Sequence, residues 1–300
     1  MAQNKNSLQV RLEYAAAKAL FGILSALPLK ASYGAGYAAA RMLDVVLPKL
    51  RRVGHKNLSF ALPELTSEQR SEVIDGVFRS IGRMLVGLAR FPSLHAGNIG
   101  QWISYEGLEN YQAAKALGRG VLVATAHLGN WELSAFAHAL MTEPMHVMVR
   151  PLDNPLVDAL VEQRRTLSGN HLIYKKDAAR AVIKALRANE AVGILIDQNT
   201  APEEGVFVNF FGKLACANAA FVKLAYHSGA PVVPGVALWD ERKGRYTLHF
   251  YPQVELSGEV KEDTQRIHSI WESVIRRHPD QWMWIHRRWK TRPEGEAALY

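Results

Sequence analysis

The stretch Val121-Leu-Val-Ala-Thr-Ala-His-Leu-Gly-Asn-Trp-Glu-Leu133 decides the fold class of this 300-residue chain. It begins with a mostly apolar run of the length expected for a buried strand. Gly129 and Asn130 then suit a tight turn, and a helix is expected to begin near Trp131. A buried strand that turns directly into a helix is typical of parallel β-α-β units, whose functional side chains collect where the strands end.

On the C-terminal side of this stretch, short apolar runs alternate with amphipathic segments. With the opening strand over 121–126, the runs predict strands over 147–150, 172–174, 192–196 and 232–236, and an antiparallel strand over 246–251. The amphipathic segments predict helices over 131–141, 154–168, 178–188 and 218–227. We therefore expect an α/β fold with a mostly parallel central sheet flanked by helices.

The sequence pattern of the N-terminal part is different, because it predicts helices only. Thr66-Ser-Glu-Gln69 has the form of a capping box and predicts a helix to about residue 89. Before it, the apolar run 19–29 and the small-residue run 31–40 are each too short to span a bilayer. We expect a helical hairpin over residues 1–50 that lies along or dips into a membrane interface, with an ordinary soluble hairpin and a single spanning helix as alternatives.

The charge and cysteine content limit the partners and the compartment. The chain has 36 Lys and Arg residues against 28 Asp and Glu residues, which gives a net charge of +8. Hydrophobic residues make up 48% of the chain, and this content excludes an intrinsically disordered chain. A net positive charge suits an anionic bilayer, an acidic protein or a nucleic acid. The lone Cys216 excludes an intrachain disulfide and a multi-cysteine metal site, fits a reducing compartment, and is expected to pack in the core.

The C-terminal run 276–292 interleaves six Arg or Lys residues with three Trp residues. This mixture is typical of an aromatic and cationic band at a lipid interface. Its alternative is a solvated basic face over core tryptophans. A nucleic acid is not an expected partner, because no recognition motif accompanies the basic residues.

His127 and Glu132 are the candidates for acid–base chemistry. On one helix, side chains five residues apart would point roughly 140° away from each other, so they can meet only if His127 lies in the turn before the helix. Glu132 could then accept the Nδ1 proton and leave Nε2 free as a general base. The alternative is a surface His–Glu pair without a catalytic role.

Other candidates lie near the ends of neighbouring predicted strands. Arg150 could stabilise an oxyanion or bind a substrate phosphate, or it could form a structural salt bridge with Asp197 or another carboxylate. Asp197 and Gln198 are expected to orient Arg150 or the headgroup of an acceptor. Two further sets complete the substrate-binding candidates: Asn130, expected mainly to shape the turn, and Phe210 with Phe211, which could belong to the core or to an acyl channel.

The string His127-Leu-Gly-Asn-Trp-Glu132 resembles the signature of the bacterial lipid A late acyltransferases, a branch of the His-x4-Asp/Glu glycerolipid acyltransferases of the lysophospholipid acyltransferase type. Further blocks of that family resemble segments found in the expected order along nearly the whole chain: 56–65 with 67–70, Val149-Arg-Pro-Leu152, Ile196-Asp-Gln198, 205–212 and Ala230-Pro-Val-Val-Pro234. One departure is Asn209, where the family usually has proline before Phe-Phe-Gly.

The resemblance implies an O-acyltransferase domain over residues 51–300. It implies transfer of a fatty acyl chain from a thioester of acyl carrier protein or coenzyme A to a hydroxyl of a membrane glycolipid such as a lipid A precursor. No cofactor or metal is expected, and the enzyme is expected at the cytoplasmic face of the bacterial inner membrane, peripheral or shallowly inserted. Alternatives are another acceptor, a phosphatidylinositol mannoside-like glycolipid or a lysophospholipid, and a non-catalytic lipid-binding protein.

Overall fold

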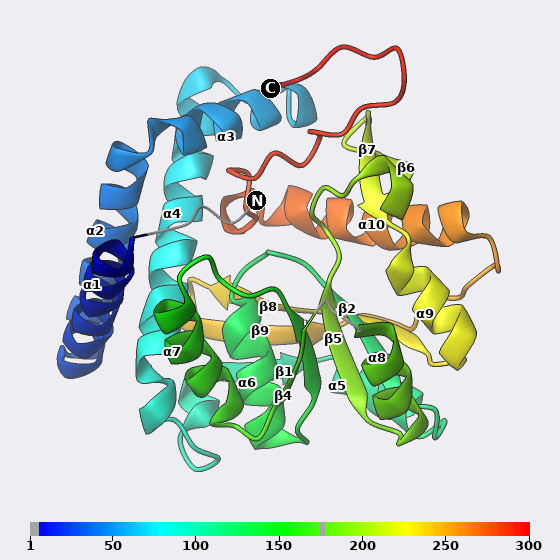
Figure 1. Ribbon diagram of the computed structural model, residues 1–300, viewed down its shortest axis with the longest axis horizontal. Helices are drawn as coiled ribbons and strands as arrows, with labels where there is room; N and C mark the ends of the chain where they lie inside the picture. The colour runs from blue at the N-terminus through cyan, green and yellow to red at the C-terminus, as the bar shows by residue number, and fades with distance from the viewer. Residues whose placement is uncertain (1–5, 175–177) are drawn as a thin grey trace.

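A seven-stranded sheet forms the centre of the computed structural model, which describes residues 6–174 and 178–300 (Figure 1). Its strands lie in the order β1-β9-β8-β2-β5-β3-β4. Their bounds are β1 Ile103–Glu106, β2 Val121–Thr125, β3 His146–Val149, β4 His171–Tyr174, β5 Ala191–Leu195, β8 Val232–Asp240 and β9 Arg245–Phe250. The five strands from β8 to β4 run parallel to one another, and β9 pairs antiparallel with β8. The expected mostly parallel sheet is confirmed.

Helices cover both faces of the sheet. Successive residues of a strand point to opposite faces, and in the central strands the residues on both faces are apolar, so both faces must be covered. Leu122 and Ala124 of β2 belong to the core shared with α8 (Ala178–Arg187), α9 (Ala220–Ser228) and α10 (Val260–Arg277). Val121 and Val123 belong to the core shared with α5 (Leu108–Lys115) and α6 (Trp131–Met141). The remaining helix of this part, α7 (Pro155–Thr166), connects β3 to β4.

Several elements of the sheet region were not predicted from sequence. They are the edge strand β1, helices α5 and α10, and the antiparallel hairpin of β6 (Gly205–Phe210) and β7 (Lys213–Asn218), which lies outside the main sheet. The hairpin turns at Phe211 and Gly212, both of which have positive φ. It packs against α10, and Figure 1 shows the C-terminal segment, which we define as residues 279–300, passing beside it.

The N-terminal helices pack on one long helix, α4 (Ser67–Arg90), which begins with the expected capping box at Thr66. Helices α1 (Ser7–Ala26) and α2 (Leu29–Val46) form a hairpin, and α3 (Pro48–Ala61) follows α2. Helix α2 approaches α4 so closely that a Cβ on Gly36 would lie 2.7 Å from the carbonyl oxygen of Gly82. Among the described residues, no helix combines the length and the apolar character needed to cross a lipid bilayer.

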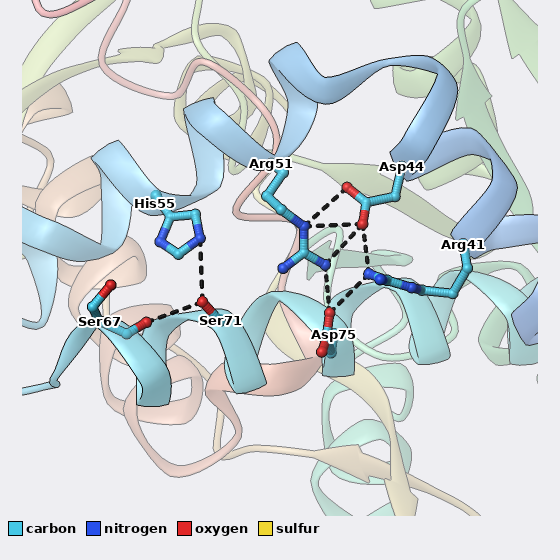
Figure 2. Close-up of polar contacts among 7 residues, drawn as sticks. All are labelled: Arg41, Asp44, Arg51, His55, Ser67, Ser71 and Asp75. Atoms are coloured by element: carbon cyan, nitrogen blue, oxygen red, sulfur yellow. Dashed lines mark hydrogen bonds and ion pairs between the residues drawn. The ribbon is translucent and has the colours of Figure 1, made fainter.

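An ion-pair network fixes the bend between α2 and α3, which we call the elbow (residues 42–47) (Figure 2). Asp44, with a side chain only 4% exposed, accepts hydrogen bonds from both Arg41 and Arg51. Both arginines also pair with Asp75 of α4. Two cations and two anions thus satisfy one another, and they tie the elbow to the long helix.

Candidate active site

His127 lies in the turn between β2 and α6, at the carboxyl edge of the sheet. The turn is tightly determined, because Gly129 has a φ of 64° and a Cβ there would lie 1.9 Å from the carbonyl oxygen of Ala237. Asn130 is fully buried, and its side chain accepts a hydrogen bond from the backbone N–H of Leu133 to cap α6. Asn130 therefore shapes the turn that holds His127.

The acceptor for the Nδ1 proton of His127 is Asp197, which follows β5. Nδ1 lies 2.8 Å from Oδ1 of Asp197, and the backbone N–H of His127 donates to Oδ2 at 2.9 Å. The two residues meet because β2 and β5 are adjacent parallel strands, so their carboxyl ends lie at one edge. The expected contact between Nδ1 and Glu132 is wrong in this structure.

The Asp197 carboxylate is buried and charged. Its side chain is 2% exposed, and a third donor, the indole N–H of Trp282, reaches Oδ2 at 2.7 Å. Burial alone raises the pKa of Asp197, but the His127 ring and the hydrogen bonds from His127 and Trp282 outweigh it and lower the pKa to about 2. With an ionised acceptor on Nδ1, the neutral imidazole carries its proton there and keeps a lone pair on Nε2.

Glu132 has a different partner, Arg165 of α7. The two side chains form a bidentate pair, with Nε to Oε2 at 2.8 Å and Nη2 to Oε1 at 2.5 Å. Burial lowers the pKa of Arg165, whereas the Glu132 hydrogen bonds and charge raise it, and the net change is a rise. Arg165 is not among the residues predicted from sequence, because nothing in the sequence separates it from the adjacent Arg164.

Gln198 is the other side chain in contact with the His127 ring. Its Nε2 lies 3.2 Å from Nε2 of His127. The following residue, Asn199, is anchored to the C-terminal segment, because its backbone N–H donates to His286 and its side chain exchanges hydrogen bonds with Thr291. The sequence-predicted residues His127, Asp197 and Gln198 thus lie together.

Arg150 does not join this group. Its side chain is 82% exposed and pairs only loosely with Asp153, at 3.5 Å. The residue follows β3, which is separated from β2 by β5, and the guanidinium points into solvent rather than toward Asp197. A role of Arg150 in binding a phosphate or an oxyanion stays a prediction.

The aromatic candidates are part of the core. Phe210 and Phe211 are 0% and 3% exposed, and they pack against three C-terminal tryptophans that are also buried: Trp282, Trp284 and Trp289. The structure therefore corrects the expected aromatic band at a lipid interface and gives Phe210 and Phe211 a packing position instead of a channel wall. Cys216 is buried as well, which confirms its packing role.

Helix α4 and the C-terminal segment close the site from one side. A small pocket beside His127 is lined by Val77, Ser80 and Ile81 of α4, by Trp131 of α6, and by Gln281 and Met283 of the C-terminal segment. The backbone N–H of Met283 also donates to the carbonyl oxygen of His127. Within the described residues, no group of three or more His, Cys, Asp or Glu side chains could hold a metal ion.

The family model of the bacterial lipid A biosynthesis acyltransferases matches residues 2–291. The chain belongs to this family. It is 32% identical over 275 residues to the lipid A biosynthesis palmitoleoyltransferase of Escherichia coli, covering 88% of this chain and 87% of the relative. It is 31% identical to the lauroyltransferase of the same organism, covering 91% and 90%, and 25% identical to the myristoyltransferase, covering 83% and 78%. The expected O-acyltransferase class is confirmed.

We expect His127 to act as a general base. Asp197→Asn should then lower kcat of this acyltransferase by about 10²–10⁴-fold, because an amide cannot balance the imidazolium that forms. The measurement is steady-state acyl transfer by the purified, folded variant. The matched control is Asp153→Asn, which removes an exposed carboxylate after β3 and should leave kcat within about twofold of wild type. Wild-type kcat in Asp197→Asn would contradict the assignment.

Proposed function

We propose that this chain transfers a fatty acyl group from an acyl thioester to a hydroxyl of a lipid A precursor, with His127 as general base and Asp197 as its partner. The observation that carries the proposal is the His127–Asp197 pair at a strand edge, with Nε2 directed away from the buried carboxylate. The pair is the arrangement needed to activate an alcohol, which is a poor nucleophile at neutral pH. Glu132, the expected partner, instead holds Arg165 in place.

The proposed reaction balances without a further reactant. The acceptor hydroxyl gives its proton to Nε2 of His127 while its oxygen attacks the thioester carbonyl carbon. The negative charge of Asp197 stabilises the imidazolium that results. The tetrahedral intermediate then collapses, the carbon–sulfur bond breaks, and the thiolate takes the proton back from Nε2. The products are an ester and a free thiol.

Family membership supports the choice of acceptor. The relatives are named for lipid A biosynthesis, but their names specify three different acyl chains: palmitoleoyl, lauroyl and myristoyl. Their identities to this chain are 32%, 31% and 25%, so identity does not single out one acyl chain. We therefore propose a lipid A precursor as acceptor and assign no chain length. A lysophospholipid or another glycolipid would offer His127 the same kind of hydroxyl, whereas a non-catalytic lipid-binding protein would have no use for a buried His–Asp pair.

A basic surface between α8 and α9 supports an acidic carrier protein as thioester donor. Arg180, Lys184 and Arg187 occupy one face of α8, and with Ile183 and His227 they line a depression. A stripe of cations with one apolar residue is complementary to an acidic protein helix. We also expect Lys175 and Lys176, which precede α8 in the sequence, to belong to a basic patch for an acidic carrier protein, but both lie outside the described residues.

The elbow supports docking at a membrane surface. Its apolar side chains are exposed: Met42 66%, Val45 74%, Val46 66% and Leu47 46%. Lys49 and Arg52 are exposed directly after it. Apolar side chains beside cations are the composition that binds an anionic lipid interface.

The apolar surface extends toward the catalytic edge. Leu8 and Leu12 at the start of α1 are each 62% exposed. Asn154, which caps α7, donates to the carbonyl oxygen of Val10 and so ties the start of α1 to the loop after β3. Because that loop lies at the carboxyl edge of the sheet, where His127 also lies, docking there would bring the lipid acceptor close to the base.

Purified enzyme is expected to add one acyl group to a lipid A precursor in detergent micelles when supplied with acyl carrier protein or coenzyme A thioesters. His127→Ala should reduce the rate by about 10²–10⁴-fold. Mass spectrometry of the lipid product is the measurement, and His95→Ala, which removes an exposed histidine, is the control. A wild-type enzyme that acylates only a lysophospholipid would replace the proposed acceptor, and one that neither acylates nor hydrolyses any thioester would overturn the function.

The triple variant Met42→Gln/Val45→Gln/Val46→Gln is expected to bind phosphatidylglycerol vesicles at least about tenfold more weakly, because each buried apolar side chain contributes on the order of 1–2 kcal/mol. Vesicle sedimentation is the measurement. Leu117→Gln is the control, since Leu117 is 48% exposed just before β2, at the opposite edge of the sheet. Equal binding of the triple variant and wild type would move the docking surface elsewhere.

A further inference from the structure

We propose that Gln198 is a catalytic hydrogen-bond donor, whose amide N–H moves from Nε2 of His127 in the free enzyme to the thioester carbonyl oxygen during acyl transfer. The inference rests on the proposed function and adds the group that stabilises the developing oxyanion. It starts from one contact, the 3.2 Å distance between Nε2 of Gln198 and Nε2 of His127.

The direction of this hydrogen bond follows from the buried carboxylate. The Asp197 carboxylate accepts at Nδ1, so in the neutral form of His127, the form that can act as a base, the proton lies on Nδ1 and Nε2 carries a lone pair. An amide nitrogen can only donate. Gln198 therefore donates to the same lone pair that must receive the proton of the acceptor hydroxyl.

This arrangement requires an exchange of partners when substrate binds. The acceptor hydroxyl must replace the Gln198 amide at Nε2 before its proton can be removed. The displaced amide N–H is then within about one hydrogen-bond length of the attacking oxygen, next to the carbonyl that this oxygen attacks. As the carbonyl oxygen gains negative charge, a donor at that position stabilises it.

The surroundings of Gln198 favour a movable side chain on a fixed backbone. The backbone is held on both sides, by Asp197 and by the anchored Asn199. The Thr291 hydroxyl also donates to the carbonyl oxygen of Thr200 at 2.7 Å. The Gln198 side chain is half-buried, and its contact with His127 is the hydrogen bond that the structure shows for it. Rotation of the side chain can thus redirect the amide without moving the loop.

The other candidate donors are less well placed. Arg150 is 82% exposed and lies beyond β5, and Arg165 is engaged in a bidentate pair with Glu132. Among the described residues, Gln198 is the side-chain donor that contacts Nε2 of His127. The position of the reacting atoms is defined by that nitrogen, so Gln198 is the group nearest to the charge that develops.

The test compares Gln198→Met, which keeps the length but has no donor, with Gln198→Ala. Both are expected to lower kcat by about 10²–10³-fold, the loss typical of a missing oxyanion donor, while KM for the acceptor changes less than about threefold. Thioester hydrolysis without acceptor should fall by a similar factor, because water attack passes through the same oxyanion. Asn199→Ala is the control for loop anchoring, and thermal melting checks the fold of each variant.

Each alternative role of Gln198 gives a different result. If the amide only covers the base, kcat of Gln198→Met equals or exceeds that of wild type. If Gln198 binds the acceptor headgroup, KM for the acceptor rises and hydrolysis is unchanged. Either result overturns this proposal while wild-type transfer still supports the proposed function, whereas an inactive wild-type enzyme would count against the function itself.

Discussion

The buried carboxylate of Asp197 accepts three hydrogen bonds, from the backbone and the ring of His127 and from the indole of Trp282. A charge with a 2% exposed side chain is costly to bury unless its oxygens are satisfied, so these donors must be held in place by the rest of the fold. They come from the turn after β2 and from the C-terminal segment, whereas Asp197 itself follows β5. Removing any one of them would leave the buried charge with one hydrogen bond fewer. The chemistry that we propose for His127 and the closure of the domain therefore depend on the same contact.

The C-terminal tryptophans have a structural role. Trp282 is both a donor to Asp197 and a member of the cluster formed with Phe210 and Phe211. The same segment reaches the catalytic turn through the backbone, because Gly129 donates to the carbonyl oxygen of Gln281. Aromatic packing thus positions a polar group at the end of the chain against a strand end near its middle. The exposed apolar side chains lie instead at the elbow and at the start of α1, where we propose the lipid contact.

Local sequence patterns predicted individual helices and strands well. They did not predict which elements lie side by side in the fold. The capping box at Thr66, the strand and turn around His127, and helix α6 over 131–141 follow from patterns within a few residues and agree with the structure. The partner of His127 was wrong, because the choice between Glu132 and Asp197 depends on which strand lies beside β2, and strand order is not a local property. The prediction that the interleaved Arg and Trp residues of the C-terminus form a band at a lipid interface was wrong for a related reason. The same alternation suits a lipid interface and a core with a basic rim, and only the tertiary fold separates them.

The central claim is that Asp197, rather than Glu132, orients His127. ¹⁵N NMR of histidine-labelled enzyme tests it directly, with the His127 signals assigned by their loss in His127→Ala. The account predicts a protonated Nδ1 and a non-protonated Nε2 in the wild-type enzyme. It also predicts that Asp197→Asn perturbs the hydrogen-bonded Nδ1 signal strongly, whereas Glu132→Gln leaves it nearly unchanged. An Nδ1 signal that responds to Glu132→Gln and not to Asp197→Asn would contradict the account.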